Sequence, residues 1–144
     1  IALAGCAQPS MAPSINTAAA RVLDALGISM VEAAGAGCCG AVRFHLDDQD
    51  GARDDARRNI DAWWPSIQAG SVEAIVMTAS GCGVQVKDYG HALAGDAAYA
   101  EKDQDPGLAF GRMISAERKK RLAAIAEDCA RAPARLDDVE RAEE

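Results

Sequence analysis

The chain has 144 residues, of which 49% are hydrophobic and 26% charged, so it is long enough for one domain with a buried core. Its formal net charge is −7 and it has no basic stripe, which argues against nucleic acid as a partner. No apolar run approaches the length of a transmembrane helix, so we expect no direct membrane span.

The chain opens at Ile1, inside a predicted strand, and we therefore expect it to be part of a longer protein. Its five cysteines are an odd number and are not spaced like a secreted disulfide framework. Cysteines that bind a metal or carry out redox chemistry in a reducing compartment explain this spacing better than disulfides do, which favours a cytoplasmic location.

Short apolar segments alternate with helical patterns over the first hundred residues. The apolar segments predict buried strands over residues 1–5, 28–33 and 72–78. Apolar spacing predicts helices over residues 13–26 and 50–64 and around residues 86–93. The order β-α-β-α-β-α predicts an α/β fold, a small three-layer domain built on a short parallel sheet.

Charge density divides the sequence near residue 100. The last 44 residues carry 20 charged side chains, against 17 in the first 100. We therefore expect a packed domain over residues 1–100 and a charged, mostly helical tail over residues 101–144. The fifth cysteine, Cys129, falls on an apolar helical stripe of this tail and is interpreted as a core residue.

Each predicted strand ends at a cysteine. Cys6 follows the first strand, Cys38 and Cys39 follow the second, and Cys82 follows the third. Because the carboxyl ends of parallel strands meet at one edge of a sheet, this topology predicts four thiols on one rim. Cys38 and Cys39 are adjacent, and a disulfide between them would be strained, so a shared metal or cluster explains the pair better.

The residue types around the four cysteines favour an iron–sulfur cluster. Grouped thiolates repel one another, and without a cation they would stay protonated or oxidise. Clusters are held by cysteine thiolates that accept hydrogen bonds from backbone N–H groups. Glycines, which let the backbone approach a ligand closely, flank these cysteines. The glycines expected in these cluster loops are Gly5, Gly37, Gly40, Gly81 and Gly83.

Three other interpretations of the cysteines stay open. Zinc also binds four thiolates, although structural zinc sites usually take them from C-x₂₋₄-C pairs, which this chain lacks. The cysteines could also pack as small apolar residues in a core. A thiol-redox enzyme using Cys38 and Cys39 ranks low, because no proton-handling partner is evident.

Several motifs resemble the cysteine-rich CCG domain found in heterodisulfide reductase B subunits and related iron–sulfur oxidoreductases. Within that family the chain is most similar to the C-terminal CCG domain of glycolate oxidase iron–sulfur subunits. The similarity extends over roughly residues 1–100. The segments that carry it are Ala-Gly-Cys-Ala-Gln-Pro-Ser at 4–10, Gly-Cys-Cys-Gly-Ala-Val-Arg-Phe-His at 37–45, Arg-Asn-Ile-Asp-Ala-Trp-Trp-Pro at 58–65 and Thr-Ala-Ser-Gly-Cys-Gly at 78–83.

The resemblance implies an electron-transfer module with a 4Fe-4S cluster, in which Cys6, Cys38, Cys39 and Cys82 are the metal ligands. Electrons would pass from glycolate, oxidised at a flavin on a partner subunit, toward a quinone-type acceptor. The implied partners are flavin-containing and other subunits of a glycolate oxidase complex, cytoplasmic or membrane-associated through those subunits. The chain is then a non-flavin subunit that is not active alone. The alternative is a non-redox interaction domain with structural zinc on the same cysteines.

The sequence departs from the family pattern in two places. Ala79 stands where the wider family has the first cysteine of a C-x-x-C motif, which leaves four ligands instead of five. The tail after Tyr99 no longer resembles the family.

Two other side chains near the predicted site are candidates for function. Arg43 is a candidate for tuning the cluster or contacting a partner, with an ordinary surface arginine as the alternative. Trp63 fits the apolar stripe of its helix, which leaves Trp64 as the candidate partner contact. His45 and His91 are considered as zinc ligands but are interpreted as plain polar residues.

Overall fold

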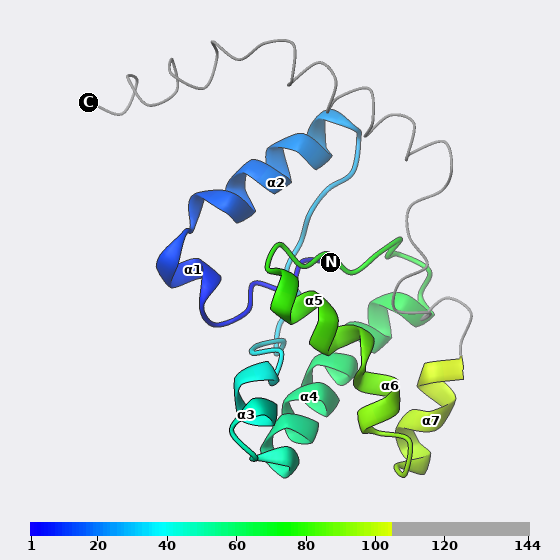
Figure 1. The fold of residues 1–144 in the computed structure, drawn as a ribbon. Helices are drawn as coiled ribbons and strands as arrows, with labels where there is room; N and C mark the ends of the chain where they lie inside the picture. Colours follow the sequence, from blue (N-terminus) through cyan, green and yellow to red (C-terminus); the bar gives the residue numbers. More distant parts are fainter. Residues whose placement is uncertain (105–144) are drawn as a thin grey trace. The chain divides into compact units, whose positions relative to one another are not determined.

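The computed structural model describes residues 1–104, which fall within one compact unit and whose regular elements are helices (Figure 1). The predicted tail from residue 105 onward, including Cys129, lies outside the described residues. The helices are α1 (Gln8–Met11), α2 (Ser14–Ala25), α3 (Ala41–His45), α4 (Gln49–Gln68), α5 (Ser80–Lys87), α6 (Tyr89–Ala92) and α7 (Ala97–Gln104).

The predicted parallel sheet, and with it the three-layer α/β fold class, is wrong for the described part of the chain. There, the three apolar segments meet through two isolated parallel bridges, from Ala2 to Glu32 and from Ala2 to Val76. The Ala2 N–H donates to Val31 O at 2.7 Å, and the Leu3 N–H donates to Val76 O at 2.9 Å. The N-terminal segment thus lies between the other two, but the pairing is too short to form strands.

A lack of helical cover explains why no sheet forms among these residues. Parallel sheets are stable when helices bury both of their faces. The first of the predicted helices forms as α2, and α2 buries none of its residues. Val31, in the middle of the second apolar segment, is 55% exposed. The molecule is therefore organised around a helix instead of a sheet.

That helix is α4, which contacts both α3 and α6. It begins after Asp48, whose side chain accepts a hydrogen bond from Gly51 N at 3.0 Å and so caps the first turn. Its predicted apolar stripe is buried, with Ala56, Ile60 and Trp63 among the core residues. The helix continues past Pro65 to Gln68 instead of ending at the proline.

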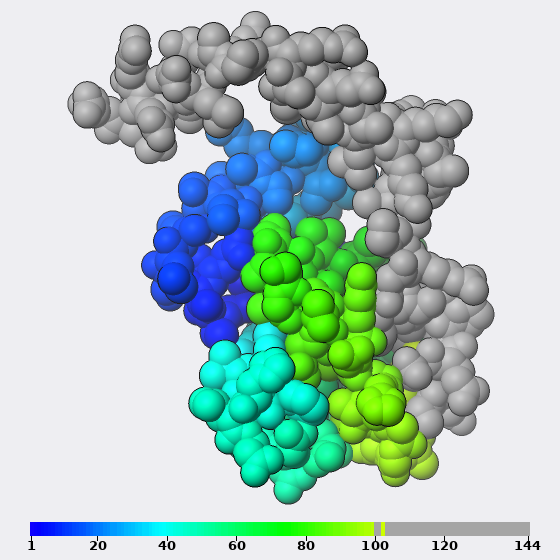
Figure 2. Space-filling view, viewed as in Figure 1, coloured from blue at the N-terminus to red at the C-terminus, as the bar shows by residue number. Residues whose placement is uncertain are grey.

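The partners of α4 in the core come from α5 and α6. Val86, Tyr89 and Leu93 are buried, as their helical spacing predicted. The Tyr89 ring stacks on Trp63 with 6.4 Å between ring centroids. Burying side chains of this size contributes about 1.5–3 kcal/mol each, so this contact anchors α6 on α4. Figure 2 shows the segments of α3 and α5, which contact each other, side by side on one face.

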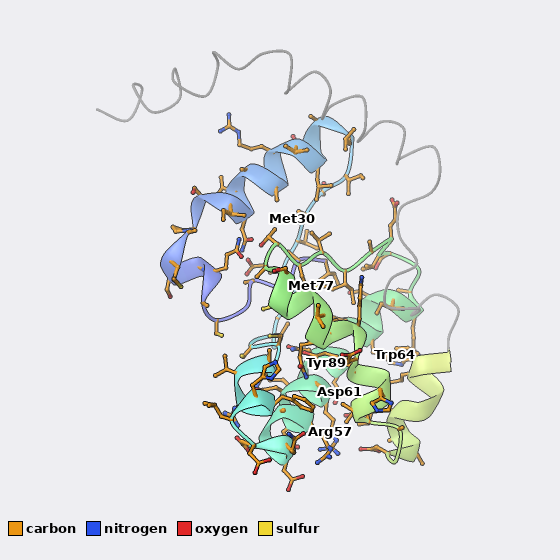
Figure 3. All side chains as sticks on the ribbon, in the orientation of Figure 1. Met30, Arg57, Asp61, Trp64, Met77 and Tyr89 are labelled. Atoms are coloured by element: carbon orange, nitrogen blue, oxygen red, sulfur yellow. The ribbon has the colours of Figure 1, made fainter. Side chains whose placement is uncertain are left out.

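An ion pair and a hydrogen bond join α7 to α4. Asp61 Oδ2 accepts from the Tyr99 hydroxyl at 2.6 Å, and Asp61 Oδ1 accepts from Lys102 Nζ at 2.7 Å. Burial alone would raise the pKa of Asp61, but the hydrogen bonds from Lys102 and Tyr99 outweigh it and lower this pKa. Asp61 and Trp64, both labelled in Figure 3, lie on the part of α4 that contacts α7.

We expect the Asp61 contacts to stabilise the fold only when the carboxyl is ionised. A lowered pKa means that the stabilisation is present above the ordinary aspartate pKa of about 3.9 and is lost as the pH falls through the lower folded-state value. Replacing Asp61 by Asn should lower the free energy of unfolding by up to about 1 kcal/mol at pH 7, because the Asp61 side chain is half exposed. Urea unfolding of both chains from neutral to acidic pH measures this, with the exposed Asp24→Asn as a charge control. If Asp61→Asn were still less stable than the wild type in acid, the stabilisation would not come from the ionised carboxyl.

Among residues 1–104, no helix is both long enough and apolar enough to cross a bilayer.

Candidate metal centre

Three loops far apart in the sequence bring four cysteines together. Cys6 precedes α1, Cys38 and Cys39 precede α3, and Cys82 lies in the first turn of α5. The Cys38 thiol contacts Cys6 Sγ at 3.3 Å, although the two residues are 32 positions apart. The Cys82 thiol is near enough to Cys39 to raise the pKa of Cys39. The three loops therefore bring the four thiols together as two neighbouring pairs.

Two of the metal-free thiols, Cys6 and Cys39, hold their protons more strongly than a free cysteine. Burial raises the pKa of Cys39 to about 12; the Ala41 N–H opposes this, while the neighbouring Cys82 and Cys38 thiols reinforce it. The pKa of Cys6 is also raised, first by its hydrogen bond with Cys38 and then by burial and nearby thiols. Four thiolates at this place therefore need a cation to compensate their charge.

Backbone N–H groups lie beside three of the four sulfurs. The Gly40 N–H donates to Cys38 Sγ, with 3.5 Å between nitrogen and sulfur. The Ala41 N–H acts to lower the pKa of Cys39, and the Ala7 N–H acts to lower the pKa of Cys6. Such bonds stabilise thiolate and set the electronic properties of iron–sulfur clusters. An all-thiol donor set with backbone donors around it fits an iron–sulfur group.

The sulfurs do not surround one common atom. Within the part of the chain that the structure describes, no three cysteine, histidine or carboxylate side chains are grouped closely enough to hold a single metal ion. A structural zinc ion needs four donors around one atom, whereas the thiolates of a cluster bind different metal atoms. His45 and His91 are both exposed.

The glycines beside the cysteine pair allow the loop to approach α4. Gly40 has a φ of +84°, and a Cβ there would lie 3.0 Å from Ala52 O and 3.2 Å from Asp55 Cβ. A Cβ on Gly37 would lie 3.0 Å from Arg58 Nη2. Close packing on the backbone of α4, together with the positive φ, therefore requires glycine at position 40, whereas a Cβ at position 37 would meet only the flexible end of Arg58.

The other three predicted glycines are less constrained. Gly5 has a φ of +72°, and a Cβ there would make an ordinary 3.8 Å contact with Cys82 Sγ. Gly81 and Gly83 lie within α5, and a Cβ at either position would meet nothing within 4 Å.

The structure places three buried residues beside the cysteine loop, a position that sequence reasoning missed: Asn59, Tyr89 and Asp55. Asn59 and Tyr89 bond to the backbone of the cysteine loop. Asp55 pairs with Arg58 at 2.6 Å and lies 3.3 Å from Arg43 Nε. One signal could have revealed Asn59, because it stands four positions before Trp63, on the apolar side of a helix where a polar residue needs a buried partner.

Arg43 and Trp64 have partners within the described residues. Besides its contact with Asp55, Arg43 Nη1 lies 3.5 Å from Asp48 Oδ2, and the arginine side chain is half exposed. Trp64 is partly buried, with Lys102 Nζ 5.6 Å from the centre of its ring. Both side chains therefore make contacts within the chain, and their roles in tuning a cluster or contacting a partner stay predictions.

Comparison with known proteins identifies relatives of this chain. It is 60% identical over 100 residues to the glycolate oxidase iron-sulfur subunit of Escherichia coli (strain K12), which covers 69% of this chain and 24% of that protein. It is 30% identical over 98 residues to the probable glycolate oxidase iron-sulfur subunit of Bacillus subtilis (strain 168), covering 68% of this chain and 21% of that protein. The chain thus spans about a quarter of the length of these relatives. No solved structure matches it significantly.

Residues 2–87, which include all four clustered cysteines, match the family model described as a cysteine-rich domain, CCG. This confirms the resemblance read from the motifs. The chain belongs to the cysteine-rich CCG domain family.

Proposed function

We propose that this chain is the electron-transfer module of a glycolate-oxidising flavoprotein complex, with a cluster of the 4Fe-4S type on Cys6, Cys38, Cys39 and Cys82. The observation that carries the proposal is its 60% identity to a glycolate oxidase iron-sulfur subunit, in a chain whose four thiols come together. Electrons would arrive from a flavin on a partner subunit and leave toward a quinone-type acceptor. Because the chain covers only 24% of the Escherichia coli relative, it would act as part of such an assembly and not alone.

The residues around the site are suited to this role. A bound cluster supplies a group that gains and loses one electron with little movement of its ligands. The four cysteines would hold it, and the N–H groups of Gly40, Ala41 and Ala7 would stabilise the charge on their sulfurs. Cys39 is buried whereas Cys6 is exposed, so one side of the site is shielded from water and the other is open to a partner. An exposed side is what electron exchange between subunits requires.

Anaerobic loading of the 144-residue chain with iron and sulfide tests the proposal. We expect a brown protein whose visible absorption bleaches when photoreduced flavin is added, with iron and sulfide in equal amounts. Electron paramagnetic resonance of the reduced form reports the cluster type. A colourless chain that holds one zinc ion after purification would instead support a non-redox interaction domain.

A further inference from the structure

Two buried side chains bond directly to the backbone of the cysteine pair. Asn59 Oδ1 accepts from the Gly37 N–H at 2.8 Å, and Asn59 Nδ2 donates to Cys38 O at 2.8 Å. One amide thus bonds to two consecutive residues of the loop that leads into Cys39. Asn59 is 0% exposed, so water does not compete for these bonds.

Tyr89 extends this contact to the second cysteine. Its hydroxyl donates to Cys39 O at 2.9 Å and accepts from Asn59 Nδ2 at 2.9 Å. The ring is buried against Trp63, which fixes the direction of the hydroxyl. The carbonyls of both cysteines are therefore held by residues on α4 and α6.

The remaining contact with this loop is more exposed. Arg58 Nη2 also donates to Cys38 O, at 3.1 Å, but its side chain is 43% exposed. Hydrogen bonds between buried groups are stronger and restrict motion more than bonds that compete with water. Asn59 and Tyr89 are therefore the residues best placed to determine where the two sulfurs point.

We propose that Asn59 and Tyr89 are positioning residues that hold Cys38 and Cys39 in their ligating orientation before a metal group binds. The inference rests on the proposed function, namely that these thiols hold a cluster. Residues that orient metal ligands typically change metal affinity by about 10-fold to 100-fold when they are replaced. Loss of the Asn59 and Tyr89 contacts should therefore loosen the bound group without removing any ligand.

The test compares two tyrosine variants that each lose a phenolic hydroxyl. Tyr89→Phe loses the bonds to Cys39 O and from Asn59 Nδ2 and keeps the ring on Trp63, while Tyr99→Phe loses the bond to Asp61. We expect iron to pass to a chelator about 10-fold to 100-fold faster from loaded Tyr89→Phe than from the wild-type chain. Release from Tyr99→Phe should be unchanged.

Two further measurements separate positioning from a general loss of stability. Ile60→Val should destabilise the core, in which Ile60 is buried, but retain the hydrogen bonds from Asn59 and Tyr89 to the loop, so its iron release well below the melting temperature should stay near that of the wild type. In the metal-free chain, Asn59→Asp removes the two amide N–H donors, and hydrogen exchange at Cys39 and Gly40 should accelerate relative to α3. This readout does not depend on cluster loading.

The possible failures are distinguishable. A wild-type chain that takes up no iron would overturn both the proposed function and this inference. Equal iron release from Tyr89→Phe and Tyr99→Phe would overturn the positioning role alone. The positioning role would also be overturned if Ile60→Val released iron as fast as Tyr89→Phe at equal stability.

Discussion

Replacing Cys38 by Ser should abolish retention of the metal group, and Cys39→Ser should do the same. Each change removes one of four thiolate donors, and a serine hydroxyl does not ionise at neutral pH to replace it. We expect the iron that stays bound through gel filtration to fall at least about tenfold below the wild type, in line with the effect of altering a metal site. Metal analysis and visible absorption of anaerobically loaded chains measure this.

The chain supplies its own control for that experiment. Cys129→Ser removes the cysteine that lies outside the motif-bearing part of the sequence, and iron retention should not change. If Cys38→Ser and Cys39→Ser keep as much iron as Cys129→Ser, the assignment of the site is wrong.

Gly40→Ala should be the most destabilising small substitution in the cysteine loop. Its φ of +84° costs about 1–2 kcal/mol for a residue with a Cβ. The new methyl group would also lie 3.0 Å from Ala52 O, and that carbonyl belongs to the backbone of a helix and cannot move easily. Overpacking of this kind adds about 1–3 kcal/mol. Urea unfolding of the metal-free chain, monitored by far-ultraviolet circular dichroism, measures the total loss in the free energy of unfolding.

Substitutions at two other glycines separate the conformational cost of Gly40→Ala from its packing cost. Gly70 has a φ of +64°, and an added methyl group there would meet nothing within 4 Å, so Gly70→Ala should show the conformational cost alone. Gly81 lies in α5 with open space around it, and Gly81→Ala should be neutral or stabilising by up to about 1 kcal/mol. Equal losses in Gly40→Ala and Gly70→Ala would show that close packing on α4 contributes nothing.

The helices could be predicted from the sequence where apolar residues recur at helical spacing. The stripe through Ala56, Ile60 and Trp63 corresponds to the buried face of α4. Val86, Tyr89 and Leu93 are also buried, but the single short helix expected there is divided into α5 and α6, and Leu93 follows the end of α6. The predicted helix over residues 13–26 also forms, as α2, but its apolar residues Ile15 and Val22 are exposed. Periodicity indicates that a helix has an apolar face, but it does not say whether anything in the chain covers that face.

The sheet could not be judged from local pattern, because strand formation depends on what packs on both faces. The apolar segments do lie side by side, with the N-terminal segment in the middle, but they are joined by single bridges. Each apolar segment leads into one of the cysteine loops, so their side-by-side arrangement is enough to bring the cysteines together. The proximity of the thiols was therefore predictable although the sheet was not. Their metal binding stays a prediction.

The positions of Asn59, Tyr89 and Asp55 next to the cysteine loop could not be predicted from the sequence. The Asn59 and Tyr89 contacts join residues 21 and 50 positions apart, and all three positions arise only when α3, α4 and α6 pack together. Spacing along the chain identified the donors of the site, whereas the residues that orient them depend on tertiary packing.

The separation of Cys6, Cys38 and Cys82 along the chain has a thermodynamic consequence. An inorganic group bound to all three would act as a removable cross-link, because it closes long loops and lowers the conformational entropy of the unfolded polypeptide while it stays attached. The melting temperature would then rise with the supply of iron and sulfide, and unfolding would release them. Depletion of these elements would leave a chain that is easier for proteases to degrade.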